Sequence, residues 1–315
     1  MSISRISTNY AFIRSLRNIT DSFLNLDELR EKLNTGKEIN RPSDDPVGMQ
    51  KVFALGTSIR ENECLQKNID SGLGRLNAAS STLEQVEEIL LDIIEIATSS
   101  ATTVATSAER AASAQEVEVL LDQLVNLANS THGGKFIFGG YNTVTGAFPL
   151  SSPFNAVLGT DGFISGVVQN SCGINMLVFT DILPGVQDSV NISGAAPFQP
   201  NGQGQVGDMF NVLVNFRQNL LNNDVDALKV SQQEIEDALT TVIEQDSLIG
   251  AKINKLEIAQ DTLNVMTTNE KEAKSNIEDA DYAQLLIEYS QAEILFNTTL
   301  SATSTLLQNS LINFI

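Results

Sequence analysis

Three glycines in the second half of the chain have the spacing of a dinucleotide-binding loop. Gly202, Gly204 and Gly207 spell G-x-G-x-x-G ahead of a predicted helix, and Asp226 lies about where a ribose-binding acid would be expected. The residues before the motif, ISGAAPFQPN, do not have a strand pattern, and no βαβ unit follows. We interpret the motif as a flexible linker that returns from a β-rich insert, and we predict no cofactor.

Few other residues have types and spacing that suit catalysis or metal binding. His132 is the only histidine, and it precedes a glycine pair, so we interpret it as a helix C-terminal residue whose charge complements the helix dipole. The acids Asp44 and Asp45 suit a helix N-cap better than a metal site. Cys64 and Cys172 are too few for a disulfide framework and are interpreted as unpaired. We therefore predict no catalytic residues, no metal site and a protein that is not an enzyme.

The charge balance narrows the range of partners. Acidic residues outnumber basic residues by 39 to 19, which gives a net charge of -20. Nucleic-acid binding needs basic surface to displace counterions, so a nucleic-acid partner is not expected. No apolar run reaches the roughly 18 residues of a membrane helix, and the first 20 residues lack the apolar centre of a secretory signal peptide. We expect no membrane partner, while export through an uncleaved N-terminus stays open.

Helical periodicity fills the first part of the chain. Residues 3–33 are predicted to form an amphipathic helix, which the small residues and glycine at 34–36 should end. Asp45 followed by Pro46 predicts the start of a second helix over about 46–99.

The second half of that predicted helix carries a heptad seam. The seam residues are Leu76, Ala79, Leu83, Val86, Leu90, Ile93 and Ala97. Gly72 and Gly74 lie just before them, and each costs about 1 kcal/mol in a helix relative to alanine, so we expect that the helix can be interrupted there.

A β-rich insert separates the first helices from the last ones. Thr106 and Glu109 have capping-box spacing and open a third helix, which the H-G-G run at 132–134 is expected to end. Residues 135–207 contain short β-prone runs between Gly, Pro, Asn and Ser, which predicts a hairpin and a small β-rich insert. Asp208 then caps a return helix.

The return part of the chain mirrors the first part. An Asn-Asn-Asp run at 222–224 predicts a break, after which a second long seam begins. The seam comprises Leu239, Val242, Ile249, Ile253, Leu256 and Leu263, with Asp246 and Gln260 as polar members of the same register. A last amphipathic helix should run from about residue 285 almost to Ile315.

These elements predict a mainly α fold, with a long antiparallel coiled-coil or helical-bundle core and a small β-rich inserted domain. Three domains are expected. The first is a terminal coiled-coil domain of residues 1–39 and 276–315; the second is a helical middle domain of residues 40–140 and 205–275. Residues 141–204 would form the outer β-rich domain.

The two terminal helices are predicted to lie side by side and to assemble with other subunits. Residues 1–20 carry three arginines and no acid, whereas 278–315 carry five acids and no base, so an antiparallel pair would place Arg17 near Glu293. Because two helices cannot bury two wide apolar stripes within one copy, we expect residues 1–35 and 280–315 to become ordered only when neighbouring subunits cover them. The predicted subunit-assembly residues are Ile6, Ile13, Leu16, Phe23, Leu285, Tyr289, Phe296, Leu300, Leu307 and Leu311.

Three segments carry a resemblance to a known family. EKLNTGKEINRPSDDPVGM at 31–49 resembles the N-terminal signature of the flagellin family, and NIEDADYAQLLIEYSQAEILFNTTLSATSTLLQNSL at 276–311 resembles its C-terminal signature. GGKFIFGGYNTVTGAF at 133–148 is similar to the segment that opens the outer domain in the family's hook–filament junction subunits. The resemblance covers about 1–148 and 205–315. Its signature loop comprises Arg41, Pro42, Ser43, Asp44, Asp45 and Pro46.

The resemblance implies a non-enzymatic subunit of the bacterial flagellum that adapts the hook side to the filament. It further implies type III export without cleavage and an extracellular location. The implied partners are the preceding hook-associated junction protein, flagellin, copies of the chain in a ring, and a cytosolic export chaperone on the C-terminal helix. Two alternatives stay open: filament flagellin, and a secreted coiled-coil adhesin or translocator-like protein.

Overall fold

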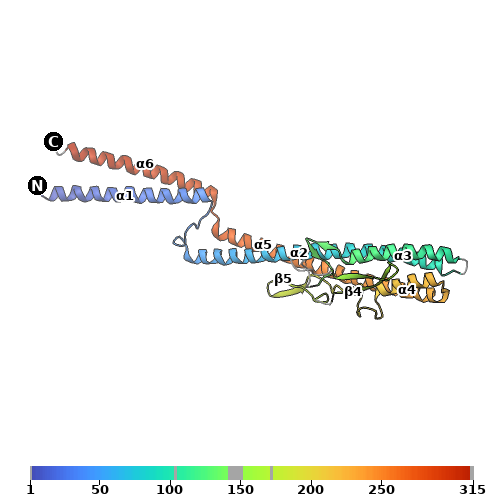
Figure 1. Ribbon diagram of the computed structural model, residues 1–315. Coiled ribbons are helices and arrows are strands. Elements are labelled where there is room, and N and C mark those ends of the chain that lie inside the picture. The colour runs from blue at the N-terminus through green and yellow to red at the C-terminus, as the bar shows by residue number, and fades with distance from the viewer. Residues whose placement is uncertain (1, 103–104, 141–151, 171–172, 313–315) are drawn as a thin grey trace. The chain divides into compact units, whose positions relative to one another are not determined.

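The computed structural model describes residues 2–102, 105–140, 152–170 and 173–312. It divides the chain into two compact units, one of residues 1–61 and 265–315 and the other of residues 62–264. The described part confirms the mainly α fold (Figure 1). Its helices are α1 (Ser2–Thr35), α2 (Pro46–Ser100), α3 (Ser107–Ala128), α4 (Met209–Asn222), α5 (Val225–Glu278) and α6 (Tyr282–Ile312).

The long helix α2 runs through Gly72 and Gly74 without a break, so the expected interruption is wrong. The reason is packing around Gly72. A Cβ atom there would lie 2.8 Å from Val190 Cγ1 and 3.2 Å from Leu256 Cδ1. Glycine therefore admits neighbouring side chains against α2, and their contact offsets the low helix propensity of the residue.

The two predicted seams form the core of the second unit. Every seam residue of α2 from Leu76 to Ala97 is at least 97% buried, and burying a side chain of the size of Leu90 stabilises by about 1.5–3 kcal/mol. The polar members of the α5 seam have partners on α2. Asp246 Oδ1 accepts a hydrogen bond from Ser80 Oγ at 2.6 Å, and Gln260 donates to Asp70 at 2.6 Å.

Among the described residues of the second unit, three separate antiparallel strand pairs accompany these helices. The strands of the described part are β1 (Thr131–His132), β2 (Lys135–Phe136), β3 (Phe154–Leu158), β4 (Ile164–Gln169), β5 (Phe179–Leu183) and β6 (Val186–Ser189). Contacts between aromatic rings anchor the insert: Phe154 lies 5.2 Å from Phe198 and 5.5 Å from Phe210 between ring centroids. The β-rich insert is therefore confirmed for its described residues.

The predicted position of His132 at a helix end is wrong. Helix α3 ends at Ala128, with Asn129 as its C-cap, and His132 belongs to β1. Gly133 and Gly134 have φ angles of 58° and 75° and connect β1 to β2. Two successive positive φ angles suit a two-residue hairpin turn, so this pair turns a hairpin and does not cap a helix.

An ion pair attaches the insert to helices α3 and α4. Glu118 on α3 accepts a hydrogen bond from the Ile164 backbone N–H at 2.7 Å and pairs with Arg217 on α4. The Arg217 guanidinium lies 5.3 Å from the centroid of the Phe163 ring. Because both charged side chains are largely buried, removing either one would leave a buried charge without its partner.

Candidate assembly surface

Helices α1 and α6 form an antiparallel pair within the first unit, with the two chain termini at the same end (Figure 1). The rings of Phe23 and Phe296 lie 6.0 Å apart between centroids. This contact sets a register that places Arg17 opposite residues well beyond Glu293. Within the described residues no ion pair joins Arg17 to Glu293, so the predicted pairing is right in direction and wrong in register.

One line of residues on α6 faces α1. Leu285 and Thr303 on this line are buried, and Tyr289, Ala292 and Phe296 are half-buried. The line repeats at alternating steps of four and three residues, as expected for two helices in a coiled coil. A two-helix pair covers only this line, and the rest of each helix faces outward.

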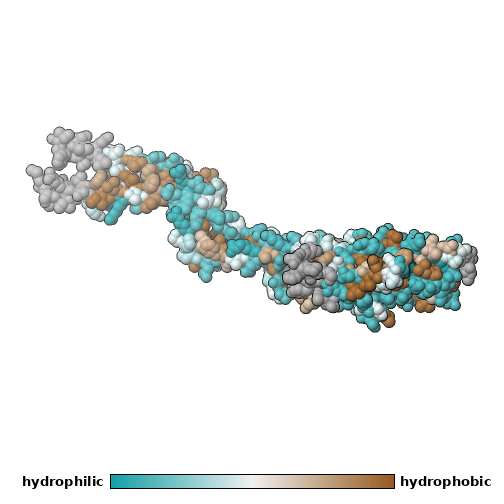
Figure 2. Space-filling model, viewed as in Figure 1, coloured by the Kyte–Doolittle hydropathy of each residue, from teal (hydrophilic) through white to brown (hydrophobic). Residues whose placement is uncertain are grey.

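Both helices expose large apolar side chains, and Figure 2 shows a group of them on the face in view. Side chains with 40–69% exposure include Tyr10, Ile13, Leu16, Phe23 and Leu24 on α1, and Leu286, Ile287, Ile294, Leu295 and Leu300 on α6. Apolar groups gathered in this way on a soluble chain are typical of a surface that binds another protein.

The predicted assembly residues divide between the two faces. Ile13, Leu16 and Leu300 are at least 40% exposed and are available to a partner, whereas Leu285 is used inside the pair. Phe23 is 53% exposed and also contacts Phe296 within the pair. Tyr289 and Phe296 are half-buried against α1, and the side chains of Ile6, Leu307 and Leu311 lie outside the described residues. The role of the set in assembly stays a prediction.

The sequence prediction missed the outermost apolar residues of α6. Ile287 and Ile294 are 60% and 64% exposed. Their signal in the sequence is a second apolar line, seven residues apart, beside the one that begins at Leu285. Once one line of α6 is assigned to contact α1, this second line must face a partner or water.

The signature loop is a compact structure held by two acids. Asp44 Oδ2 accepts hydrogen bonds from the backbone N–H groups of Arg41 at 2.8 Å and Asn40 at 3.2 Å. These bonds, that of Arg41 first, lower the pKa of Asp44. Asp45 Oδ1 accepts from the Val47 N–H at 3.0 Å, which confirms Asp45 as the N-cap of α2. The loop is thus a helix start and a turn, made by the acids that the motif supplies.

Hydrogen bonds join the end of α1 and the residues that follow it, 36–38, to the connection between α5 and α6. The Glu38 N–H donates to Glu278 O at 2.8 Å, and the Ala280 N–H donates to Gly36 O at 3.1 Å. The Tyr282 hydroxyl donates to Leu33 O at 2.5 Å. These bonds fix the two chain passages together at the base of the α1–α6 pair.

Glu278 adds an electrostatic contact at the same place. Its carboxylate pairs with Lys37 and, at 3.3 Å, with Lys274. Burial opposes ionisation of Glu278, but the two lysines outweigh it and hold the pKa of Glu278 below its ordinary value.

The other sequence motifs do not assemble into a reactive site. The Gly204 N–H donates to Asp208 Oδ2 at 2.7 Å, and Asp208 Oδ1 accepts from the Asn211 N–H at 3.1 Å. The acid that caps α4 thus accepts from the Gly204 amide, a backbone donor of the kind that a bound phosphate would use. In the part of the chain that the structure describes, no three His, Cys, Asp or Glu side chains are grouped to hold a metal, and no helix is long and apolar enough to cross a membrane.

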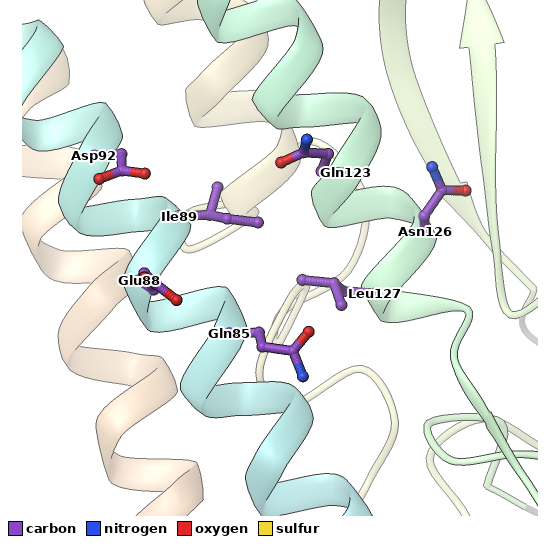
Figure 3. Close-up of a pocket in the computed structure, with 7 residues that line it drawn as sticks. All are labelled: Gln85, Glu88, Ile89, Asp92, Gln123, Asn126 and Leu127. Carbon is purple, nitrogen blue, oxygen red and sulfur yellow. The ribbon is translucent and has the colours of Figure 1, made fainter.

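A groove of about 510 Å³ lies between α2 and α3 in the second unit (Figure 3). Its walls are carboxylates and carboxamides beside two aliphatic side chains. The lining residues are Gln85, Glu88, Ile89, Asp92, Gln123, Asn126 and Leu127. This set contains no hydroxyl, thiol or imidazole group, so it offers no serine, threonine or cysteine nucleophile.

These features define a class of protein. Both ends of the chain are committed to one helical pair, and this pair leaves large apolar side chains uncovered. Such a surface is typical of an assembly subunit, in which other molecules would complete the terminal helices.

The comparisons with known proteins agree with this class. The N-terminal helical region of bacterial flagellin matches residues 6–143, and the C-terminal helical region of bacterial flagellin matches residues 232–315. Together the two regions cover well over half of the chain. The chain belongs to the bacterial flagellin family, whose members are structural components of the flagellum.

Individual relatives come from both branches of this family. The chain is 27% identical to the flagellar filament 30.7 kDa core protein of Treponema maltophilum, over 86% of this chain and 85% of that one. It is 24% identical to flagellar hook-associated protein 3 of Escherichia coli K12, over 95% of this chain and 94% of that one. A solved structure described as a flagellar hook-associated protein of Vibrio parahaemolyticus has a TM-score of 0.64 and 18% identity, over 75% of this chain and all of that one. The last comparison establishes the fold.

Proposed function

We propose that this chain is the junction subunit that connects the hook side of the bacterial flagellum to its filament. The observation that carries the proposal is the apolar outer face of the α1–α6 pair, at the ends of a chain that aligns over nearly its whole length with a hook-associated protein 3. An adaptor between two helical assemblies needs terminal helices whose apolar faces are covered only when neighbouring subunits bind. The hydrogen bonds of residues 33–38 and the ion pairs of Glu278 hold the base of that pair in place.

The partners follow from this position in the assembly. The preceding hook-associated protein would cover one end of a ring of copies, and flagellin would cover the other. Before export, the exposed apolar residues of α6, such as Ile287 and Ile294, would require a cytosolic chaperone to prevent aggregation. Export through the flagellar type III apparatus, without cleavage, is the route that the proposal requires.

A strain that lacks the chain tests the proposal. We expect electron micrographs to show hooks without filaments and flagellin released into the medium, and we expect the wild-type chain to restore filaments. Filaments that assemble normally on the hooks of the deletion strain would contradict the junction role.

The second candidate function is that of a filament subunit. It is favoured by the similarity to the Treponema maltophilum filament core protein over most of both chains. The two roles differ in the amount of the protein in a flagellum and in whether the protein polymerises alone. A junction subunit should be a minor component of isolated flagella, whereas a filament subunit should be the main one and should polymerise alone into long filaments.

A further inference from the structure

A pocket of about 580 Å³ lies in the first unit, between the start of α2, the residues after α1 and the end of α5. Its floor is the small buried cluster of Ile39, Met49 and Val52. Phe53 stands at its side with 63% of its surface exposed. Gly56, about one turn after Phe53 on α2, has no side chain to close the wall of the pocket there. The pocket is therefore an apolar depression that reaches solvent.

Cations dominate the rim of this pocket. Lys37, Arg60 and Lys274 line it, and Glu278 is the one carboxylate among the lining residues. Lys37 and Lys274 share that carboxylate. Arg60 donates to the Thr57 hydroxyl at 3.0 Å and, within the described residues, has no carboxylate partner. In a chain with a net charge of -20, this rim is locally positive.

Helix α6 presents the complementary chemistry on its outward face. No lysine or arginine follows Lys274. Ile287 and Ile294 are seven residues apart, so they lie on one line about 10 Å long. The acids Glu288 and Glu293 flank that line, and both are exposed. The buried line from Leu285 to Thr303 lies on the other side of the helix, so α1 of the same copy does not cover this one.

We propose that the pocket receives the Ile287–Ile294 line of α6 from a second copy of the chain. The two isoleucines would fill the apolar floor beside Phe53, and the flanking carboxylates would reach Arg60 and Lys274. Pocket and helix face are different surfaces, so this contact is heterologous. Heterologous contacts repeat head to tail and build rings or helices instead of closed pairs. The inference rests on the proposed function, because the pocket contact would join neighbouring copies within the flagellar junction.

Cysteine cross-linking in the assembled flagellum tests this contact. A strain without the native gene would express two chains together, both carrying Cys64→Ser and Cys172→Ser. One chain would add Thr35→Cys, a near-isosteric change at the pocket rim, and the other would add Ile287→Cys. Because the two cysteines lie on different chains, any disulfide between them joins two copies. Asn34→Cys, an exposed neighbour outside the pocket lining, replaces Thr35→Cys in the matched control.

After mild oxidation of isolated flagella, we expect mass spectrometry to find a peptide that contains residue 35 linked to one that contains residue 287. Its yield should exceed that of the Asn34→Cys control at least fivefold. Arg60→Glu on the pocket chain should lower the yield several-fold, and Glu288→Lys on the other chain should restore part of it. If Glu288→Lys restores the cross-link that Arg60→Glu weakens, residues 60 and 288 of two copies make the charge contact.

The outcomes separate this inference from the proposed function. If filaments stand on the hooks and the flagella contain both chains, but the link is absent or no stronger than the control, the pocket contact is wrong and the junction role stands. If the chain is missing from isolated flagella, the proposed function fails, and the pocket contact fails with it.

Discussion

The two units of this molecule share a heptad spacing of apolar residues but differ in how much of the apolar surface one copy buries. In the second unit, the seam from Leu76 to Ala97 is almost completely buried within one copy. In the first unit, the pair α1–α6 buries one line of residues, while Ile287 and Ile294 on α6 remain at least 60% exposed. Periodicity therefore predicts that a helix has an apolar face. The number of elements available to cover that face decides whether one copy is stable or needs another.

The largest expected loss of stability comes from placing a charge in the fully buried seam of α2. Leu90 is fully buried, so Leu90→Asp would bury an unpaired carboxylate and should destabilise the second unit by more than about 4 kcal/mol. We expect thermal unfolding followed by circular dichroism to show loss of this unit near room temperature. The matched control is Leu91→Asp on the next residue, which is 56% exposed and should leave the transition nearly unchanged. Equal effects of both changes would contradict the seam assignment.

The second effect should fall on assembly instead of folding. Phe296 contacts Phe23, and Phe296→Asp should separate the terminal pair and abolish incorporation into flagella. The thermal transition of the second unit should be unchanged, since Phe296 belongs to the first unit. Asn297→Asp, on an exposed neighbour, serves as the control and should be incorporated normally. Normal filaments with Phe296→Asp would show that the α1–α6 contact is not needed.

A third prediction concerns how tightly the second unit is packed. A Cβ atom at Gly194 would lie 1.8 Å from Phe138 O, so Gly194→Ala must displace backbone and should cost at least about 2 kcal/mol. Gly250 on α5 has open space around it, and Gly250→Ala should be neutral or should stabilise by up to about 1 kcal/mol. Denaturant unfolding measures both. A stabilising Gly194→Ala would mean that the insert is packed more loosely than the structure indicates.

The smallest effect should come from pH. The pKa of Glu278 is lower in the folded chain than in the unfolded one, so its contribution is present above the ordinary carboxyl range, near pH 4, and is lost as the pH falls through the folded pKa. Glu278→Gln should remove about 1 kcal/mol or less at pH 7 and flatten this acid dependence of the first unit. Hydrogen exchange of residues 36–40 between pH 3 and pH 7 measures it. An unchanged pH profile in Glu278→Gln would assign the stabilisation to other groups.

Much of the fold follows from local signals in the sequence. Capping residues such as Thr106, Asp208 and Asp45 predict helix starts because each supplies an acceptor to free backbone N–H groups. The glycine pair after His132 turns a hairpin, which is also a local signal, whereas the expected break at Gly72 is wrong because of tertiary contacts. Gly72 lies within a helix because Val190 and Leu256 pack against it.

The candidate surface was predicted less completely than the fold. The order of the elements along the chain correctly predicts that α1 and α6 run antiparallel. The charges predicted the wrong register, because the register depends on which aromatic rings meet. Which face of α6 is buried likewise depends on how α6 packs against α1. Spacing alone therefore does not show that Leu285 is buried in the pair and that Ile287 is exposed.

Hydrogen exchange distinguishes terminal helices that need neighbouring copies from terminal helices that are stable within one copy. The dilute full-length chain and the same chain in isolated flagella would be compared at the amides of residues 2–35 and 280–312. We expect rapid exchange of these amides in the dilute chain and strong protection in the flagellum, with the seam from Leu76 to Ala97 protected in both. Strong protection of both terminal helices in the dilute monomer would contradict this expectation, because the chain would then need no neighbour to complete its terminal pair.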